Sequence, residues 1–228
     1  MSNPQIDNLE KAAAILAAIP ERFVFIGGAT IALYVDEMFW DELRPTVDVD
    51  CVVEISTRSE YYALSEKLRA VGLEEDAEPG APMCRWRYRD LIVDIMPYER
   101  EILGFSNSWY KEGFQKAIDC VLPSGRTILI FPPLYLLASK VEAFLGRGQD
   151  LRLSKDIEDI IILLDGREVL EEEFARSRGE VKDFLGSWFR ENGEDLQEAI
   201  LTFVPSSSVE RQDFVIDLIE RFGRTRSA

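Results

Sequence analysis

The segment Thr46-Val-Asp-Val-Asp-Cys-Val-Val53 constrains the fold most, because β-branched residues alternate with acids along it. β-Branched residues favour strands, and alternate residues of a strand point to the same face. Asp48 and Asp50 are therefore expected to project together, with Val47 and Val49 on the opposite face. Such a pair suits Mg²⁺, which prefers oxygen ligands, although a strand with a polar, solvent-facing side gives the same pattern.

The first half of the chain alternates between strand and helix patterns, and the second half reads as helices. Strands are expected at about 23–26, 47–53, 84–88, 91–96, 117–122 and 127–131, and helices at about 6–19, 29–35 and 57–71. Thr57 with Glu60, and later Ser207 with Glu210, form capping-box patterns. After Pro132 the helices run at about 134–145, 153–164 and on to about 222. We therefore expect an α/β domain over residues 1–131 and a helical domain over residues 132–228.

Composition excludes several classes of chemistry. The 228 residues contain no histidine, which removes Ser-His-Asp hydrolysis, Cys-His proteolysis and histidine-ligated zinc. The three cysteines show neither a disulfide framework nor a paired metal motif, so a reducing cytoplasm fits best. The formal net charge of −16 argues against a broad nucleic-acid-binding surface. A nucleotide substrate stays open, because bound Mg²⁺ can invert the field of a carboxylate cluster.

The sequence shows no targeting or membrane signal. The N-terminal residues lack the basic start of a signal peptide, and charges interrupt their apolar positions. No apolar run approaches the roughly 20 residues that a spanning helix needs. The expectation is a soluble, cytoplasmic protein that does not contact membranes.

A third aspartate and a pair of glycines add to the acidic strand. Asp94 lies within Leu91-Ile-Val-Asp-Ile-Met96, an otherwise apolar strand, where a carboxylate is costly to bury without a partner. That partner is either an arginine or a metal ion. Gly27 and Gly28 join a strand to a helix, and such a turn allows close backbone approach to phosphate, although it is more often structural.

A two-residue turn at Arg89-Asp90 fixes the register of the two strands that it joins. Arg85 then lies opposite Asp94, and Arg87 lies opposite Ile92. Paired residues share a face, so both arginines are expected beside Asp94, where guanidinium groups suit phosphate. The alternative is a structural Arg85–Asp94 ion pair, and a slip of one residue would remove both ideas.

Together these segments resemble a known superfamily. Ile26-Gly-Gly28, Arg44-Pro-Thr-Val-Asp-Val-Asp50 and Val93-Asp-Ile95 are similar to the signature of the DNA polymerase β-like nucleotidyltransferases. The closest resemblance is to the AbiEii-type toxin nucleotidyltransferases of abortive-infection and type IV toxin–antitoxin systems. Further on, the lysine helix around Lys140 and the segment Lys155-Asp-Ile-Glu-Asp159 fit the same family.

The resemblance implies an α+β nucleotidyltransferase fold, a mixed sheet with flanking helices followed by a helical C-terminal part. It also implies roles for individual residues. Asp48, Asp50 and Asp94 would hold Mg²⁺ or Mn²⁺, and Asp94 would also act as the base. The nucleotide would be bound by Gly27, Gly28, Thr30, Lys140, Asp156 and Asp159, and our register argument adds Arg85 and Arg87. Without the resemblance, Lys140, Asp156 and Asp159 read as an ordinary solvated surface.

The expected function is metal-dependent transfer of a nucleotidyl group from a nucleoside triphosphate to a hydroxyl. The acceptor is left open among RNA, a protein side chain and a small molecule, and an antitoxin is an implied partner. Two alternatives stay open. One is an inactive nucleotidyltransferase-fold scaffold that binds a partner, and the other is a small-molecule enzyme of the antibiotic-modifying kind.

Overall fold

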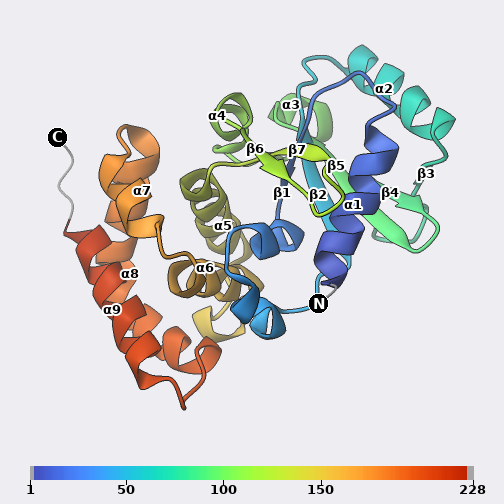
Figure 1. Ribbon diagram of the computed structural model, residues 1–228. Coiled ribbons are helices and arrows are strands. Elements are labelled where there is room, and N and C mark those ends of the chain that lie inside the picture. Colours follow the sequence, from blue (N-terminus) through green and yellow to red (C-terminus); the bar gives the residue numbers. More distant parts are fainter. Residues whose placement is uncertain (1–2, 225–228) are drawn as a thin grey trace. The chain divides into compact units, whose positions relative to one another are not determined.

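The computed structural model describes residues 3–224 and divides into two compact units (Figure 1). The first unit holds the chain up to Leu33 together with Arg44–Pro132, and the second holds Tyr34–Leu43 together with the chain from Pro133 on. A division of the sequence at residue 131 assigns 34–43 to the N-terminal part, whereas these residues pack with the helical unit.

The first unit is built on a mixed sheet. Its strands are β1 (Phe23–Ile26), β2 (Asp48–Val53), β3 (Glu74–Glu75), β4 (Arg85–Tyr88), β5 (Leu91–Pro97), β6 (Ile118–Val121) and β7 (Thr127–Ile130). They lie in the order β3-β4-β5-β2-β1-β7-β6, a seven-stranded sheet. β2 runs parallel to β5 and antiparallel to β1, so the acidic strand lies at the centre. With its flanking helices this is the α+β architecture that the sequence predicted.

Helices flank this sheet. They are α1 (Pro4–Leu16), α2 (Arg58–Ala70), α3 (Arg100–Leu103) and α4 (Tyr110–Gln115). The side chain of Asn3 caps α1 by accepting from the backbone of Gln5 and Ile6. The predicted capping box of α2 is confirmed, since Thr57 and Glu60 bond to each other's backbone nitrogens.

The glycine turn leads into a 3₁₀ helix, so the expected helix at about 29–35 is tighter than an α-helix. This helix, η1, spans Gly28–Leu33. The Thr30 backbone nitrogen and its hydroxyl both donate to the Gly27 carbonyl, at 3.3 and 2.8 Å. These contacts span three residues, which is 3₁₀ geometry, and 3₁₀ segments stay short because their hydrogen bonds are less well aligned.

The hairpin register is confirmed. β4 pairs antiparallel with β5, with Arg85 opposite Asp94 and Arg87 opposite Ile92. Arg89 in the turn has a φ of 56°, in the left-handed region that such two-residue turns require. Trp86 lies on the other face and is buried.

The second unit is helical. It contains α5 (Pro133–Arg147), α6 (Lys155–Gly166), α7 (Leu170–Arg176), α8 (Glu180–Phe203) and α9 (Val209–Gly223), with short 3₁₀ helices η2 (Glu37–Glu42) and η3 (Leu151–Leu153). The second predicted capping box is wrong, because α9 begins after Ser208 and no side chain bonds at that cap. No helix within residues 3–224 is long and apolar enough to cross a membrane.

Charged side chains join η2 to the helical unit. Arg211 of α9 binds Asp165 of α6 and the carboxylate of Glu42, the latter at 2.9 and 2.7 Å. Hydrogen bonds to Glu42 and then to Asp165 raise the pKa of Arg211 above its usual value. The Asp36 backbone nitrogen also donates to the Gly166 carbonyl. These contacts explain why residues 34–43 leave the sheet unit.

Candidate active site

The three aspartates lie on neighbouring strands at the centre of the sheet. Asp50 of β2 pairs directly with Asp94 of β5, and Asp48 pairs with Ile92 two positions earlier. Paired residues of adjacent strands share a face, as do alternate residues of one strand. One row of the sheet therefore runs across β1, β2, β5 and β4 through Ile26, Asp50, Asp94 and Arg85. The predicted adjacency is confirmed, while the metal-binding and catalytic roles stay predictions.

Arg85 supplies the positive charge in this row. Its Nε and Nη2 donate to the two oxygens of Asp94 at 2.8 and 2.7 Å, and Nη2 also donates to Asp48 Oδ2 at 3.1 Å. These hydrogen bonds to Asp94 raise the pKa of the Arg85 guanidinium. Asp94 is only 6% exposed. The Arg85–Asp94 ion pair, which was the alternative to a phosphate-binding role, is thus present, and Arg85 also pairs with Asp48.

Two cysteine thiols beside the row are affected by its negative charge. Burial raises the pKa of Cys84 to about 12, with further contributions from Asp94 and Asp50. Burial, then Asp50 and Asp94, raise the pKa of Cys51 well above its usual value. Both thiols stay protonated at neutral pH, so neither is a nucleophile. The local field favours a cation.

The glycine turn supports the acidic strand. Gly27 has a φ of 82°, and a Cβ on it would lie 2.7 Å from Cγ of Asp50. A Cβ on Gly28 would lie 2.9 Å from Oγ1 of Thr46. Both distances are far below van der Waals contact, so a side chain at either position would displace its neighbours, and the positive φ of Gly27 adds backbone strain there. Thr30 is fully buried beneath this turn.

The donor set suits a hard divalent cation, and the Gly27 turn leaves room for the Asp50 carboxylate. The Arg85 guanidinium already stands between Asp48 and Asp94 as a cation, so the position accepts positive charge. Within residues 3–224 no group of three or more acidic or cysteine side chains is arranged as a metal site. The aspartates therefore fit a metal by the chemistry of their oxygens, and Arg85 is the cation that they hold in this arrangement.

A second set of predicted residues lies in the helical unit. Lys140 of α5 is 8% exposed, and its amine lies 2.5 Å from Asp159 and 3.7 Å from Asp156 of α6. Both aspartates are buried. These residues are therefore not the solvated surface that the sequence alone suggests. They form a buried charge cluster, and their nucleotide-binding role stays a prediction.

Two contacts of the predicted residues were not anticipated. Arg147, at the end of α5, forms an ion pair with Asp156. Its place in the sequence, between Lys140 and Asp156, was the available signal. Arg87 pairs with Asp76 at 2.9 Å instead of with the aspartate row.

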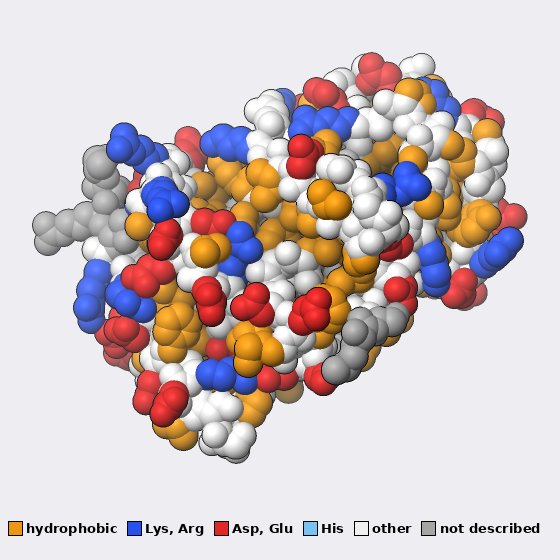
Figure 2. Space-filling model, in the orientation of Figure 1, with side chains coloured by type: hydrophobic (Ala, Val, Ile, Leu, Met, Phe, Trp, Pro, Cys, Tyr) orange, Lys and Arg blue, Asp and Glu red, His pale blue; other side chains and the backbone are white. Residues whose placement is uncertain are grey.

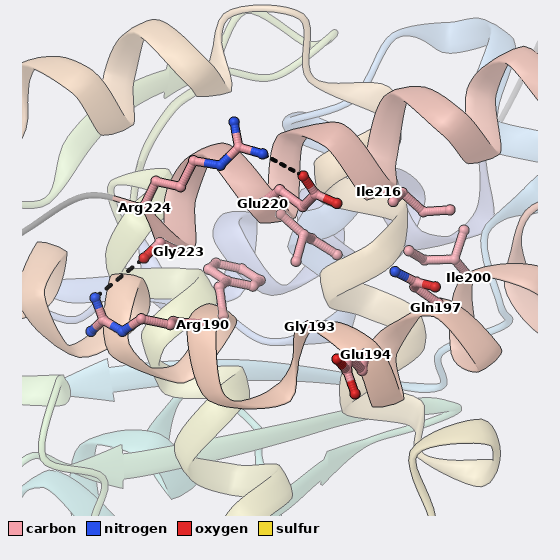
Figure 3. Close-up of a pocket in the computed structure, with 11 residues that line it drawn as sticks. Arg190, Gly193, Glu194, Gln197, Ile200, Ile216, Glu220, Gly223 and Arg224 are labelled. Atoms are coloured by element: carbon pink, nitrogen blue, oxygen red, sulfur yellow. Dashed lines mark hydrogen bonds and ion pairs between the residues drawn. The ribbon is translucent and has the colours of Figure 1, made fainter.

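The helical unit also has a pocket of its own, of about 430 Å³, between α8 and α9 (Figure 3). The residues that line it include the apolar Phe189, Ile200 and Ile219 and the charged Arg190, Glu194, Glu220 and Arg224. Arg224 pairs with Glu220, and Arg190 donates to the Gly223 carbonyl. None of the residues that line this pocket lies in the segments that carry the resemblance to nucleotidyltransferases, so the aspartate row is the stronger candidate site.

Comparisons with known proteins agree with the fold. A sequence model of one family, described as "Nucleotidyl transferase AbiEii toxin, Type IV TA system", matches residues 12–211. A crystal structure of an antigenic nucleotidyltransferase-like protein from Paracoccidioides brasiliensis aligns with a TM-score of 0.52 and 16% identity, over 93% of each chain. The antibiotic-resistance factor ANT(2'')-Ia aligns with a TM-score of 0.47 and 13% identity, over 72% of this chain and 84% of that one. No curated protein sequence gives a significant match.

Proposed function

The chain belongs to the AbiEii nucleotidyl transferase toxin family of type IV toxin–antitoxin systems, and we propose that its nucleotidyl transfer depends on a divalent metal held by Asp48, Asp50 and Asp94. The observation that carries this proposal is the row of carboxylates on the paired strands β2 and β5. Oxygen ligands on neighbouring strands are what Mg²⁺ or Mn²⁺ requires when it also takes oxygens from substrate phosphates.

In the proposed reaction an acceptor hydroxyl attacks the α-phosphorus of a nucleoside triphosphate. A bond forms from the acceptor oxygen to phosphorus, the bond to the bridging oxygen breaks, and pyrophosphate leaves. Asp94 takes the proton of the acceptor hydroxyl. A bound divalent metal would supply charge stabilisation at the phosphate oxygens. Asp94 accepts two hydrogen bonds from Arg85, which make it a weaker base while Arg85 stays in place.

The remaining predicted residues would hold the triphosphate. Gly27 and Gly28 allow the backbone to approach it closely, and Thr30 supports their turn from below. Arg85 and Arg87 share a face with Asp94, and guanidinium groups suit phosphate. Lys140 would meet the outer phosphates as a point charge, while Asp156 and Asp159 position its amine.

The acceptor is an RNA end, a protein side chain or a small molecule, and the family implies an antitoxin as a protein partner. The net charge of −16 disfavours a long RNA contact. On the face shown in Figure 2, basic side chains are interspersed with acidic ones and form no continuous basic area.

Nucleotide-dependent thermal stabilisation tests the proposal. A ligand that binds only the folded state raises the unfolding temperature. We expect nucleoside triphosphates to stabilise the protein when Mg²⁺ is present and much less when EDTA replaces it. The same stabilisation with and without Mg²⁺ would contradict a metal-dependent site, and no stabilisation by any common triphosphate would favour a scaffold.

A further inference from the structure

Arg85 occupies the position between two of the carboxylates that the proposed metal needs. Its Nη2 bridges Asp94 at 2.7 Å and Asp48 at 3.1 Å, and its Nε binds the other Asp94 oxygen at 2.8 Å. Neighbouring carboxylates repel each other, and burial makes each charge more costly. The guanidinium therefore stabilises this arrangement of acids without any metal.

A divalent cation would need the same oxygen atoms. Arg85 uses both oxygens of Asp94 and one oxygen of Asp48 as hydrogen-bond acceptors. A metal ion would bind lone pairs of the same oxygens, and its positive charge would repel the guanidinium a few ångströms away. The guanidinium and the metal therefore compete for the shared position.

We infer that Arg85 competes with the catalytic metal for the carboxylates. In the resting protein Arg85 binds Asp48 and Asp94, and it is displaced when metal and nucleotide enter. This inference rests on the proposed metal site. It makes Arg85 a positioning residue that holds Asp48 and Asp94 in register before the metal arrives. The same residue can then have two roles. Before metal binding Arg85 pairs with Asp48 and Asp94, and after its release the guanidinium can pair with a phosphate of the nucleotide.

The structure leaves space for this change of partner. Arg85 borders a pocket of about 480 Å³ within the sheet unit, and Tyr61, Tyr62 and the acids Glu75 and Asp76 border it too. The Arg85 side chain is 23% exposed already. A released guanidinium therefore has solvent-filled space beside it, although Glu75 and Asp76 already pair with Arg69 and Arg87.

The inference is tested by measuring the binding of Mn²⁺ alone to the full chain, with calorimetry or electron paramagnetic resonance. Arg85→Gln should bind Mn²⁺ about 10-fold more tightly than the wild type, a factor equal to about 1.4 kcal/mol. Arg58→Gln is the matched control, because Arg58 borders the same pocket and makes no ion pair within residues 3–224. It removes the same charge and should change the affinity little. Equal or weaker Mn²⁺ binding by Arg85→Gln would overturn the inference.

Two further variants keep the outcome clear. If Arg85→Gln does not fold, Arg85→Lys replaces it, since lysine keeps the charge but loses the two-point contact with Asp94. Its Mn²⁺ affinity should rise by a smaller factor, and an unchanged affinity would overturn the competition. Asp48→Asn separates the two proposals. If it abolishes Mn²⁺ binding while Arg85→Gln does not tighten it, the metal site stands and only the competition fails. If Asp48→Asn binds Mn²⁺ like the wild type, the metal site itself is wrong.

Discussion

The Asp50 carboxylate lies directly against Gly27, so that a Cβ at residue 27 would lie 2.7 Å from Cγ of Asp50. Gly27 also has a φ of 82°, a backbone conformation that residues other than glycine rarely adopt. The turn after β1 and the acid on β2 are therefore one structural unit. The glycine is needed both for its backbone conformation and for the room that it leaves.

Gly27→Ala is expected to abolish Mg²⁺-dependent nucleotide binding, because the new Cβ displaces the Asp50 carboxylate. Gly125→Ala is the matched control, since Gly125 has a φ of 83° and no atom within 4 Å of the added Cβ. Both variants should lose about 1–2 kcal/mol of stability from the left-handed backbone. Urea unfolding and calorimetric titration with nucleotide separate the two effects. Equal nucleotide affinity in both variants would contradict the role of Asp50.

Asp48→Asn is expected to remove Mg²⁺-dependent triphosphate binding while changing stability by no more than about 1 kcal/mol. The partly exposed Asp48 makes one contact with Arg85, at 3.1 Å, so the fold depends little on its charge. Asp90→Asn is the control, because Asp90 is an exposed acid in the β4–β5 turn. Calorimetry in the presence of Mg²⁺ measures both variants. Intact binding in Asp48→Asn would remove Asp48 from the site.

Asp94→Asn is expected to keep most of the triphosphate affinity while transfer falls about 10²- to 10⁴-fold, the usual loss for a general base. Asp48 and Asp50 would still hold the metal, whereas the proton of the acceptor would have no base. Paired measurements of affinity and of turnover decide this. If affinity falls together with rate, Asp94 is chiefly a metal ligand. If neither changes, its contact with Arg85 is structural only.

Lys140→Ala is expected to destabilise the helical unit by about 3–5 kcal/mol, because it removes the positive charge beside buried carboxylates. Lys111→Ala, at an exposed ion pair with Glu99, should change the stability little. Denaturant unfolding measures both. Below the unfolding transition, Lys140→Ala should weaken triphosphate binding more than monophosphate binding. Equal losses for the two nucleotides would show that the lysine is structural.

The sheet around the site could be predicted because strand geometry has a period of two. The spacing of Asp48 and Asp50, and the two-residue turn after Tyr88, each determined which side chains share a face. The bridging contact of Arg85 with Asp48 was beyond reach, since β2 and β4 do not pair directly and 37 residues separate these side chains.

The helical unit was harder to predict, because contacts between charged residues far apart in the sequence determine which segments pack together in it. Nothing local shows that residues 34–43 join α6 and α9, since Arg211 and Glu42 are 169 residues apart in the sequence. The capping pattern at Ser207 failed because the same short motif can occur where no side chain reaches the helix start. Asp156 and Asp159 look like surface acids until Lys140 and Arg147 are placed beside them.

Transfer of label is the most direct test of the central claim. The full chain is incubated with nucleoside triphosphates labelled in the α-phosphate, together with total cell RNA, total cell protein or small hydroxyl compounds. We predict that the wild type attaches label to one of these acceptor classes when Mg²⁺ or Mn²⁺ is present. Labelling should be lost with EDTA and in Asp48→Asn. Labelling that persists in Asp48→Asn, or that is absent from every acceptor class with wild-type protein, would contradict the account.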